Sequence, residues 1–297
     1  MSENNKLTCL SIGGVKIGFV SQKPLPFLNG TLPFRCISDS PDVRVILNDV
    51  EELPEISADY IGNDGIFRYY RKDGTYYKKA IEGAEGAVSL AVYREDFSCL
   101  QLYVKEGLLP DEIRTADKVL QFLPVWQILA HHQAFLLHSS RIIVGGKAIL
   151  FTAPSQTGKT TQARLWSRFA HARIAGNDRT LIRKRESGFE TYGYPVDGSS
   201  PVYSSEQAPL GAVVVLRQGK DNIVRRLPAP QAIRPLMEQT AMDVWDPKRY
   251  SSIHMLWPDL LEKYPVYQLT CRPDEGAVIC MKQQLEKDEV ISFDRCS

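Results

Sequence analysis

One stretch, Lys147 to Phe169, constrains the fold of this chain more than any other. It begins with Ala148–Phe151, a short apolar run between turn residues, which predicts a buried strand. It continues through a loop of small residues to Thr161–Trp166, which predicts the first turns of a helix. A strand, a loop and a helix in this order, with Gly158-Lys159-Thr160 at the junction of loop and helix, form the context that a phosphate-binding loop requires.

The chemistry of such a loop follows from its backbone. Successive N–H groups of the loop and the unpaired N–H groups of the first helical turn converge on an anion, and the helix dipole adds to the attraction. We expect the Lys159 ammonium to reach the β- and γ-phosphates of a nucleotide and the Thr160 hydroxyl to ligate Mg²⁺. The residues predicted to bind the nucleotide are Ser155, Gln156, Thr157, Gly158, Lys159, Thr160 and Thr161.

The loop departs from the usual pattern, GxxxxGK followed by Ser or Thr, at its first glycine, where this chain has Ala153. Alanine is harmless at that position if φ is negative and costly if φ is positive. Gly-Lys-Thr also occurs in ordinary loops that open a helix, so that interpretation stays open. The strand before the loop and the helix after it favour the phosphate site.

The charges of the chain are balanced, with 36 Lys and Arg against 35 Asp and Glu, which gives no reason to expect nucleic acid or a membrane surface as a partner. No apolar run approaches the ~20 residues of a membrane span, and residues 1–11 lack the basic start and apolar segment of a signal peptide. The six cysteines show no metal-ligand spacing. We therefore expect a cytoplasmic protein with reduced thiols.

Residues 1–115 are predicted to form a β-rich domain. The turn Asp73-Gly74 between two runs rich in tyrosine is a strong hairpin signal, because both turn residues tolerate positive φ. The tyrosines are typical of a half-buried sheet surface. No residue pattern here indicates chemistry, so we expect a docking or scaffold domain. The predicted strands are 15–19, 43–47, 66–70, 75–77, 87–93 and 100–104.

Residues 116–297 are predicted to form a second domain of mixed α/β structure. A helix over 115–134 should be interrupted at Pro124. The extended run 135–144 carries His138 and leads through Gly145-Gly146 into the strand of the phosphate loop, so His138 should lie on the neighbouring strand, near a bound γ-phosphate. A histidine there is also compatible with an ordinary core residue.

Asp178 follows shortly after the helix of the loop. An acidic residue at the end of a strand adjacent to a phosphate loop is where a second Mg²⁺ contact normally lies, although a turn between two strands would also accept an aspartate. The other predicted elements are a hairpin over 179–194 around residues 186–188 and strands at 211–216, 223–227 and 266–269. Helix-like stretches with breakers in them are predicted at 228–240 (with Pro235), 247–264 (with Pro258) and 274–285.

Five motifs occur in the order found in the C-terminal domain of HPr kinase/phosphorylase, and residues 115–285 resemble that domain. More closely, they resemble the HPr-kinase-related proteins of bacterial peptide-modification clusters, a superfamily that shares a nucleotide core with phosphoenolpyruvate carboxykinase. Residues before 115 match only as a variable β domain. The motifs are Leu137-His138-Ser139-Ser140, Phe151–Thr161, Gly176-Asn177-Asp178, Gly193–Ser199 and Pro265–Arg272.

The resemblance implies a carboxykinase-like core with a P-loop at Ala153–Thr160, in which Lys159 contacts phosphate and Thr160 ligates Mg²⁺. It also implies that His138 lies near the transferred phosphoryl group and that Asn177-Asp178 supply a metal ligand or orient the attacking hydroxyl. The chain departs from the family at Gln156, where glycine is usual, and at Asn177, where aspartate is usual. A glutamine at a position of positive φ would strain the loop by about 1–3 kcal/mol.

The sequence therefore predicts an ATP- and Mg²⁺-dependent kinase that transfers the γ-phosphoryl group to a hydroxyl, a serine on a peptide or protein or a small molecule. Lys159, His138 and Asp178 are the predicted catalytic residues, and Thr160 and Asp178 the predicted metal ligands. Arg225 or Arg226 could supply a further cation, and a homo-oligomer is possible. The first alternative is a non-catalytic ATP-binding module with a degenerate loop, and the second is a carboxykinase-like or phosphorylase-like enzyme.

Overall fold

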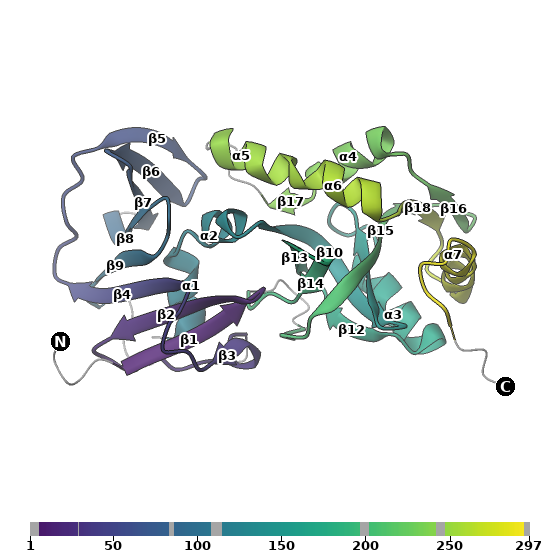
Figure 1. The fold of residues 1–297 in the computed structure, drawn as a ribbon, viewed down its shortest axis with the longest axis horizontal. Helices are drawn as coiled ribbons and strands as arrows, with labels where there is room; N and C mark the ends of the chain where they lie inside the picture. Colours follow the sequence, from purple (N-terminus) through teal and green to yellow (C-terminus); the bar gives the residue numbers. More distant parts are fainter. Residues whose placement is uncertain are drawn as a thin grey trace. The chain divides into compact units, whose positions relative to one another are not determined.

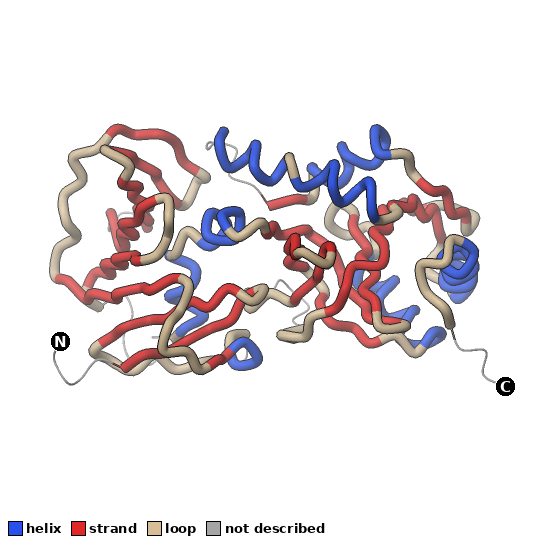
Figure 2. Tube along the Cα trace, viewed as in Figure 1, coloured by secondary structure: helices blue, strands red, loops and turns tan. Residues whose placement is uncertain are grey.

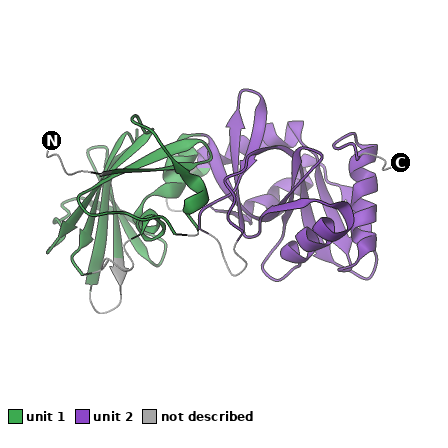
Figure 3. Ribbon diagram, turned by 90° about the horizontal axis from the view of Figure 1, so that it is seen from below, with its two compact units in different colours: residues 1–132, 243–250 green, residues 133–242, 251–297 purple. Residues whose placement is uncertain are grey.

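The structure, a computed structural model, describes residues 6–28, 30–82, 86–107, 115–196, 202–241 and 247–293. The chain divides into two compact units, shown in different colours in Figure 3. The first comprises Met1–His132 with Asp243–Tyr250, and the second comprises Gln133–Met242 with Ser251–Ser297. The division thus falls after His132 and not after residue 115, as the sequence had suggested, because two short helices belong with the first unit.

The described part of the first unit contains one sheet of nine strands, in the order β3-β1-β2-β4-β9-β8-β7-β6-β5 (Figures 1 and 2). The pairs β2/β4 and β4/β9 are parallel and the others are antiparallel. The strands are β1 (Lys6–Ile12), β2 (Val15–Ser21), β3 (Arg35–Cys36), β4 (Val43–Val50), β5 (Asp59–Asn63), β6 (Phe67–Lys72), β7 (Thr75–Glu82), β8 (Gly86–Arg94) and β9 (Cys99–Lys105), and a short 3₁₀ helix, η1, covers Leu32–Phe34.

The hairpin predicted at Asp73-Gly74 is confirmed: it joins β6 to β7, and φ is 48° at Asp73 and 76° at Gly74. Three strands of this sheet, β1, β3 and β5, were not predicted. β1 forms a second hairpin with β2 through Gly13-Gly14, both with positive φ. β5 is an edge strand whose residues are half-buried or exposed, so its sequence carries little apolar signal.

The predicted interruption at Pro124 is also confirmed, since α1 (Ala116–Phe122) and α2 (Val125–His131) lie on either side of it. Proline has no N–H, so it cannot continue the hydrogen bonds of α1. The Leu123 carbonyl instead accepts a hydrogen bond from the buried Lys78 Nζ of β7, 2.7 Å away. This contact ties the two helices to the first unit.

In the described part of the second unit, β10 is the strand with the most partners. It pairs with β11, β12, β13 and β17, all antiparallel, and the sheet runs in the order β11-β10-β13-β14-β15-β18-β16. β11 also pairs with β15 in parallel, and β15 pairs with β18 in parallel. The strands are β10 (Ala134–Val144), β11 (Lys147–Thr152), β12 (Arg173–Gly176), β13 (Arg179–Arg185), β14 (Gly188–Tyr192), β15 (Ala208–Gln218), β16 (Ile223–Arg226), β17 (Thr240–Ala241) and β18 (Val266–Cys271).

The helices of the second unit are α3 (Lys159–Ala170), α4 (Ala229–Met237), α6 (Leu256–Lys263) and α7 (Glu275–Lys287), and α5 (Pro247–His254) begins in the first unit. The helix-like stretch predicted over 247–264 forms two helices, α5 and α6, which are separated at Met255, whereas the predicted breaker Pro258 lies within α6. None of the helices in the described residues is long and apolar enough to span a membrane.

The core beneath the predicted loop is formed by α3 and α7 against β11, β15 and β18. Trp166 of α3 is fully buried, with its ring centroid 6.0 Å from that of Phe151 on β11. Ala153, the first loop residue, is also buried in this core. Burial of these side chains fixes the strand and the helix on either side of the loop.

Candidate functional site

The loop between β11 and α3 ends at position 158, where the backbone conformation favours glycine. Gly158 has φ 118° at the N-cap of α3, a conformation that L side chains rarely adopt. The helix therefore begins at Lys159, two residues earlier than the sequence indicates. No side chain caps α3, so its first-turn N–H groups stay available to an anion.

Two positions where the loop departs from the usual pattern behave differently. Ala153 does not have positive φ, so alanine carries no backbone strain there. Gln156, in contrast, has φ 63° and an exposed side chain. The loop therefore holds a non-glycine residue in the left-handed region, where strain costs about 1–3 kcal/mol.

Replacing Gln156 with glycine is expected to raise the free energy of unfolding by roughly 1 kcal/mol, because relief of the strain at positive φ exceeds the entropy that glycine loses on folding. Gln156→Ala is the matched control, because it removes the side chain but keeps a Cβ at the same φ. Urea denaturation of both variants measures the difference. A Gln156→Gly variant less stable than Gln156→Ala would contradict this description of the loop.

Lys159 turns back onto its own loop. Its Nζ donates to the Ala153 carbonyl at 2.8 Å and to the Pro154 carbonyl at 3.2 Å, and the residue is 8% exposed. Burial lowers the pKa of Lys159, and the negative charge of Asp178 partly offsets this. A phosphate at the loop would have to compete with these two carbonyls for the ammonium group.

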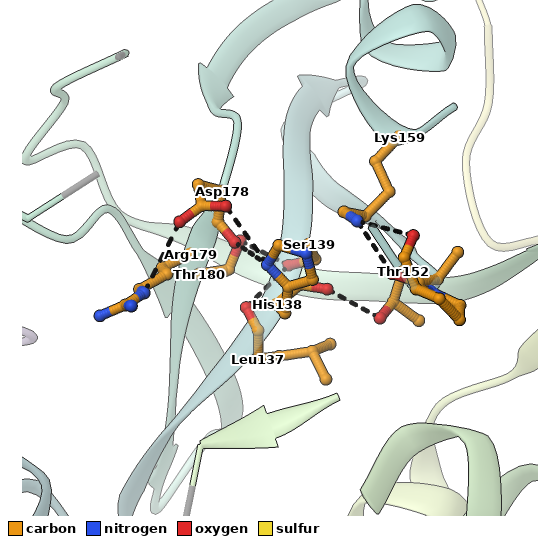
Figure 4. Close-up of polar contacts among 10 residues, drawn as sticks. Leu137, His138, Ser139, Thr152, Lys159, Asp178, Arg179 and Thr180 are labelled. Carbon is orange, nitrogen blue, oxygen red and sulfur yellow. Dashed lines mark hydrogen bonds and ion pairs between the residues drawn. The ribbon is translucent and has the colours of Figure 1, made fainter. Parts of the chain in front are cut away.

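His138 and Asp178 are in direct contact, as Figure 4 shows. The His138 Nδ1 lies 3.0 Å from the Asp178 carbonyl oxygen and 3.3 Å from its Oδ1. A carbonyl oxygen only accepts hydrogen bonds, so Nδ1 carries the proton and the neutral ring has its lone pair on Nε2. This tautomer makes Nε2 the atom that can accept a proton or a hydrogen bond from another molecule.

The backbone explains why this contact forms. β10 pairs with β13 over residues 134–138 and with β12 over residues 141–143, and Asn177-Asp178 connect β12 to β13. The Ser139 N–H donates to the Asp178 carbonyl at 3.1 Å, and the Thr152 hydroxyl of β11 donates to the His138 carbonyl at 2.9 Å. The predicted pairing of the His138 strand with the strand of the loop is thus confirmed.

The charges of this region act on one another. Burial lowers the pKa of His138, and the positive charge of Lys159 lowers it further, while the Asp178 carboxylate raises it in part. The Asp178 Oδ2 also lies 3.6 Å from the Arg179 Nε. The charges of Lys159 and Asp178 therefore both act on His138, although the three residues come from different segments of the chain.

The lowered pKa of His138 predicts a pH dependence of stability. The unfolded state takes up a proton at pH 6.5 and the folded state only at lower pH, so the unfolded state binds more protons in this window and stability falls as the pH drops through it. His138→Gln should lack this loss. Urea denaturation on both sides of pH 6.5 measures it, with the exposed His171→Gln as control. Equal pH dependence in wild type and His138→Gln would contradict the lowered pKa.

The other predicted loop residues lie around the start of α3. Thr160 is half-buried at the second position of the helix, and its hydroxyl makes no hydrogen bond within the described part of the chain. Ser155 and Thr161 are exposed, and Thr157 is half-buried. Gln218 at the end of β15 lies over the loop, with Nε2 3.4 Å from the Gln156 carbonyl. The Thr160 hydroxyl is thus free for a ligand.

The structure also shows the surroundings of Arg225, Arg226 and Asn177, which the sequence had placed near the site. Arg225 NH1 donates to Gln231 Oε1 at 3.1 Å, and Arg226 NH1 lies 3.9 Å from Asp288. The contacts of these two arginines of β16 are thus with residues outside the His138–Asp178 pair. The Oδ1 of Asn177 is buried and has no partner among the described residues. No three His, Cys, Asp or Glu side chains cluster as metal ligands in the ranges that the structure describes.

The sequence reasoning missed Arg141 of β10, which is fully buried behind the site. Its guanidinium donates to the carbonyls of Thr191 at 3.0 Å, Glu206 at 2.9 Å and Ala175 at 3.0 Å. Desolvation lowers its pKa to about 10. The sequence did contain a signal for this residue, because Arg141 precedes Ile142-Ile143 in a strand that is mostly apolar. A charged side chain buried in such a strand needs hydrogen-bond partners, so Arg141 was a candidate for a structural role.

Comparison with known proteins assigns no family. No family model matches the sequence, and no curated protein matches it. One solved structure that is similar to this chain is the Hpr(Ser) kinase/phosphatase from Coxiella burnetii, at 8% sequence identity and a TM-score of 0.32, over 52% of this chain and 98% of that one. At this identity and TM-score the similarity assigns neither a fold family nor a function to this chain.

Proposed function

We propose that the second unit binds ATP–Mg²⁺ at residues 153–161 and transfers the γ-phosphoryl group to a hydroxyl, with a seryl side chain as the preferred acceptor. The observation that carries this proposal is the convergence of Lys159, His138 and Asp178 beside an uncapped helix N-terminus. An ammonium, a neutral imidazole and a carboxylate around an anion site are the groups that phosphoryl transfer uses.

The loop residues fit a triphosphate. The N–H groups at the start of α3 have no side-chain acceptor, and Gly158 places no side chain over them. Lys159 Nζ already lies at the loop, held by two carbonyls that a phosphate would replace as its partners. We infer that this exchange moves the ammonium toward the β- and γ-phosphates, where its charge offsets theirs.

The residues proposed to hold Mg²⁺ are Thr160 and Asp178. Mg²⁺ typically takes one or two protein oxygens and completes its shell with phosphates and water, so a larger cluster of carboxylates is not required. The Thr160 hydroxyl has no partner in the described part of the chain, which fits this role. When bound, the ion neutralises charge on the phosphate oxygens.

His138 is the proposed acceptor for the proton of the attacking hydroxyl. Its Nδ1 is fixed by the Asp178 carbonyl, and its lowered pKa keeps the ring neutral at physiological pH. Nε2 is therefore able to accept a hydrogen bond from the acceptor hydroxyl. Asp178 fixes the ring through Nδ1, and its carboxylate oxygen that is not bound to Mg²⁺ would orient the same hydroxyl.

A non-catalytic ATP-binding module is the second candidate, and two observations favour it. The strained φ of Gln156 in the loop and the amide of Asn177 beside Asp178, which cannot take up a proton, are both expected in a site that binds nucleotide without turnover. In either case we propose that the β sheet of the first unit docks a partner or serves as a scaffold.

The test is phosphoryl transfer from ATP labelled in its γ-phosphate to a mixture of serine-containing peptides and small alcohols. Mg²⁺-dependent label on an acceptor supports the kinase. ATP binding without any transfer supports the non-catalytic module. Absence of ATP binding would refute both.

A further inference from the structure

A cavity of about 510 Å³ lies in the second unit on the side of the sheet away from α3. Its floor contains Val215 of β15 and Gln268 of β18, which are directly paired. Along β15, Val214 and Leu216 belong to the core shared with α3 and α7. Side chains alternate along a strand, so Val215 and Arg217 face the other way. The cavity is therefore separate from the predicted phosphate loop.

Three arginines from three elements line this cavity: Arg217 of β15, Arg225 of β16 and Arg234 of α4. Arg234 Nε lies 2.9 Å from Oε1 of Glu238, the one carboxylate among the described lining residues. Arg225 donates to the neutral Gln231 amide at 3.1 Å, and Arg217 has no hydrogen bond or ion pair within the described chain. The cavity thus has an excess of positive charge.

Arg226, the next residue after Arg225, shows that the arginines gather only on the face of the sheet that carries the cavity. Arg226 follows it on β16 and points to the opposite side, where it lies 3.9 Å from Asp288 beside α7. Arg226 thus has an acidic partner in the protein, whereas Arg217 and Arg225 have none in the part of the chain described here. Like charges brought together without a counter-charge repel, so a bound anion would stabilise this arrangement.

The shape and position of the cavity indicate the class of anion. Its volume suits a small molecule, and it lies beside Val215 and Arg217 near the end of β15 and Gln268 in the middle of β18. Guanidinium groups bind phosphate through two parallel hydrogen bonds. We propose that Arg217, Arg225 and Arg234 bind the phosphate group of a small phosphorylated molecule, at a site distinct from that of ATP.

The test uses phenyl phosphate as the probe and Lys159→Ala as the background, so that the loop does not contribute. In calorimetric titrations phenyl phosphate should bind this background, and adding Arg217→Gln or Arg225→Gln should weaken binding by about tenfold or more, since each removes a charge-assisted hydrogen bond. Arg226→Gln changes the charge equally on the same strand and should alter the affinity by less than about twofold.

The outcomes separate this site from the proposed function. Absence of phenyl phosphate binding to a folded Lys159→Ala protein would overturn the proposal, as would equal losses in Arg217→Gln and Arg226→Gln. Tighter binding of phthalate than of phenyl phosphate would overturn the assignment to a phosphate. If ATP fails to bind the wild type but phenyl phosphate binds as described, the phosphate-loop proposal fails and this site stands.

Discussion

Replacing Arg141 with alanine is expected to lower the free energy of unfolding by about 3–5 kcal/mol, since each carbonyl left without its donor costs about 1–3 kcal/mol. The guanidinium is fully buried and is the hydrogen-bond donor to carbonyls on three segments, at Ala175, Thr191 and Glu206. Alanine would leave these carbonyls without that donor, and the contacts with Ala175 and Thr191 are buried. Urea denaturation measures the change.

Arg173→Ala is the matched control for Arg141→Ala. Arg173 pairs with the Glu206 side chain at the surface, and its side chain is 62% exposed, so its loss should cost under about 1 kcal/mol. If Arg141→Ala does not fold, Arg141→Lys gives the same information, because it keeps the charge but loses the planar donors. Stability of Arg141→Ala within about 1 kcal/mol of wild type would contradict the structural role of this arginine.

Replacing Asp178 with alanine is expected to reduce phosphoryl transfer by about 10²–10⁴-fold and to weaken ATP binding only slightly. The carboxylate contacts His138 Nδ1 and is proposed to hold Mg²⁺, whereas the loop backbone and Lys159 are proposed to make most of the phosphate contacts. Transfer of label from the γ-phosphate and calorimetric ATP binding, measured on one preparation, separate the two effects.

Asp259→Ala controls for the loss of one negative charge in the same unit. Asp259 forms a surface ion pair with Lys184, and neither residue belongs to the loop or to the His138 contact. Its transfer rate should stay within about twofold of wild type. Unchanged transfer by Asp178→Ala would show that the assignment of Asp178 to metal binding or hydroxyl orientation is wrong.

The sequence correctly predicted turns and helix breaks that depend on the backbone preferences of one or two residues. Asp73-Gly74 and Pro124 constrain the backbone by themselves, and both produce the expected turn and break. β5 and β17 were missed because these strands exist through pairing with β6 and β10 and have little pattern of their own. The break at Met255 between α5 and α6 is likewise not marked by glycine or proline at that residue.

The candidate site was predictable in part for the same reason. Glycine at 158 and the strand order around His138 follow from turn chemistry and from the short Gly145-Gly146 connection. The carbonyl partners of Lys159 and the burial of Arg141 depend on side chains from distant segments, which one sequence does not reveal. The roles of the site residues remain predictions for experiment.

Calorimetric titration of ATP, with and without Mg²⁺, tests the central claim most directly. Wild type should bind ATP with an affinity that Mg²⁺ increases, and Lys159→Ala should lose about 2–5 kcal/mol of binding free energy. Arg164→Ala, an exposed arginine on α3, should bind like wild type. Absence of binding by the wild type, or equal binding by Lys159→Ala, would contradict a nucleotide site at this loop.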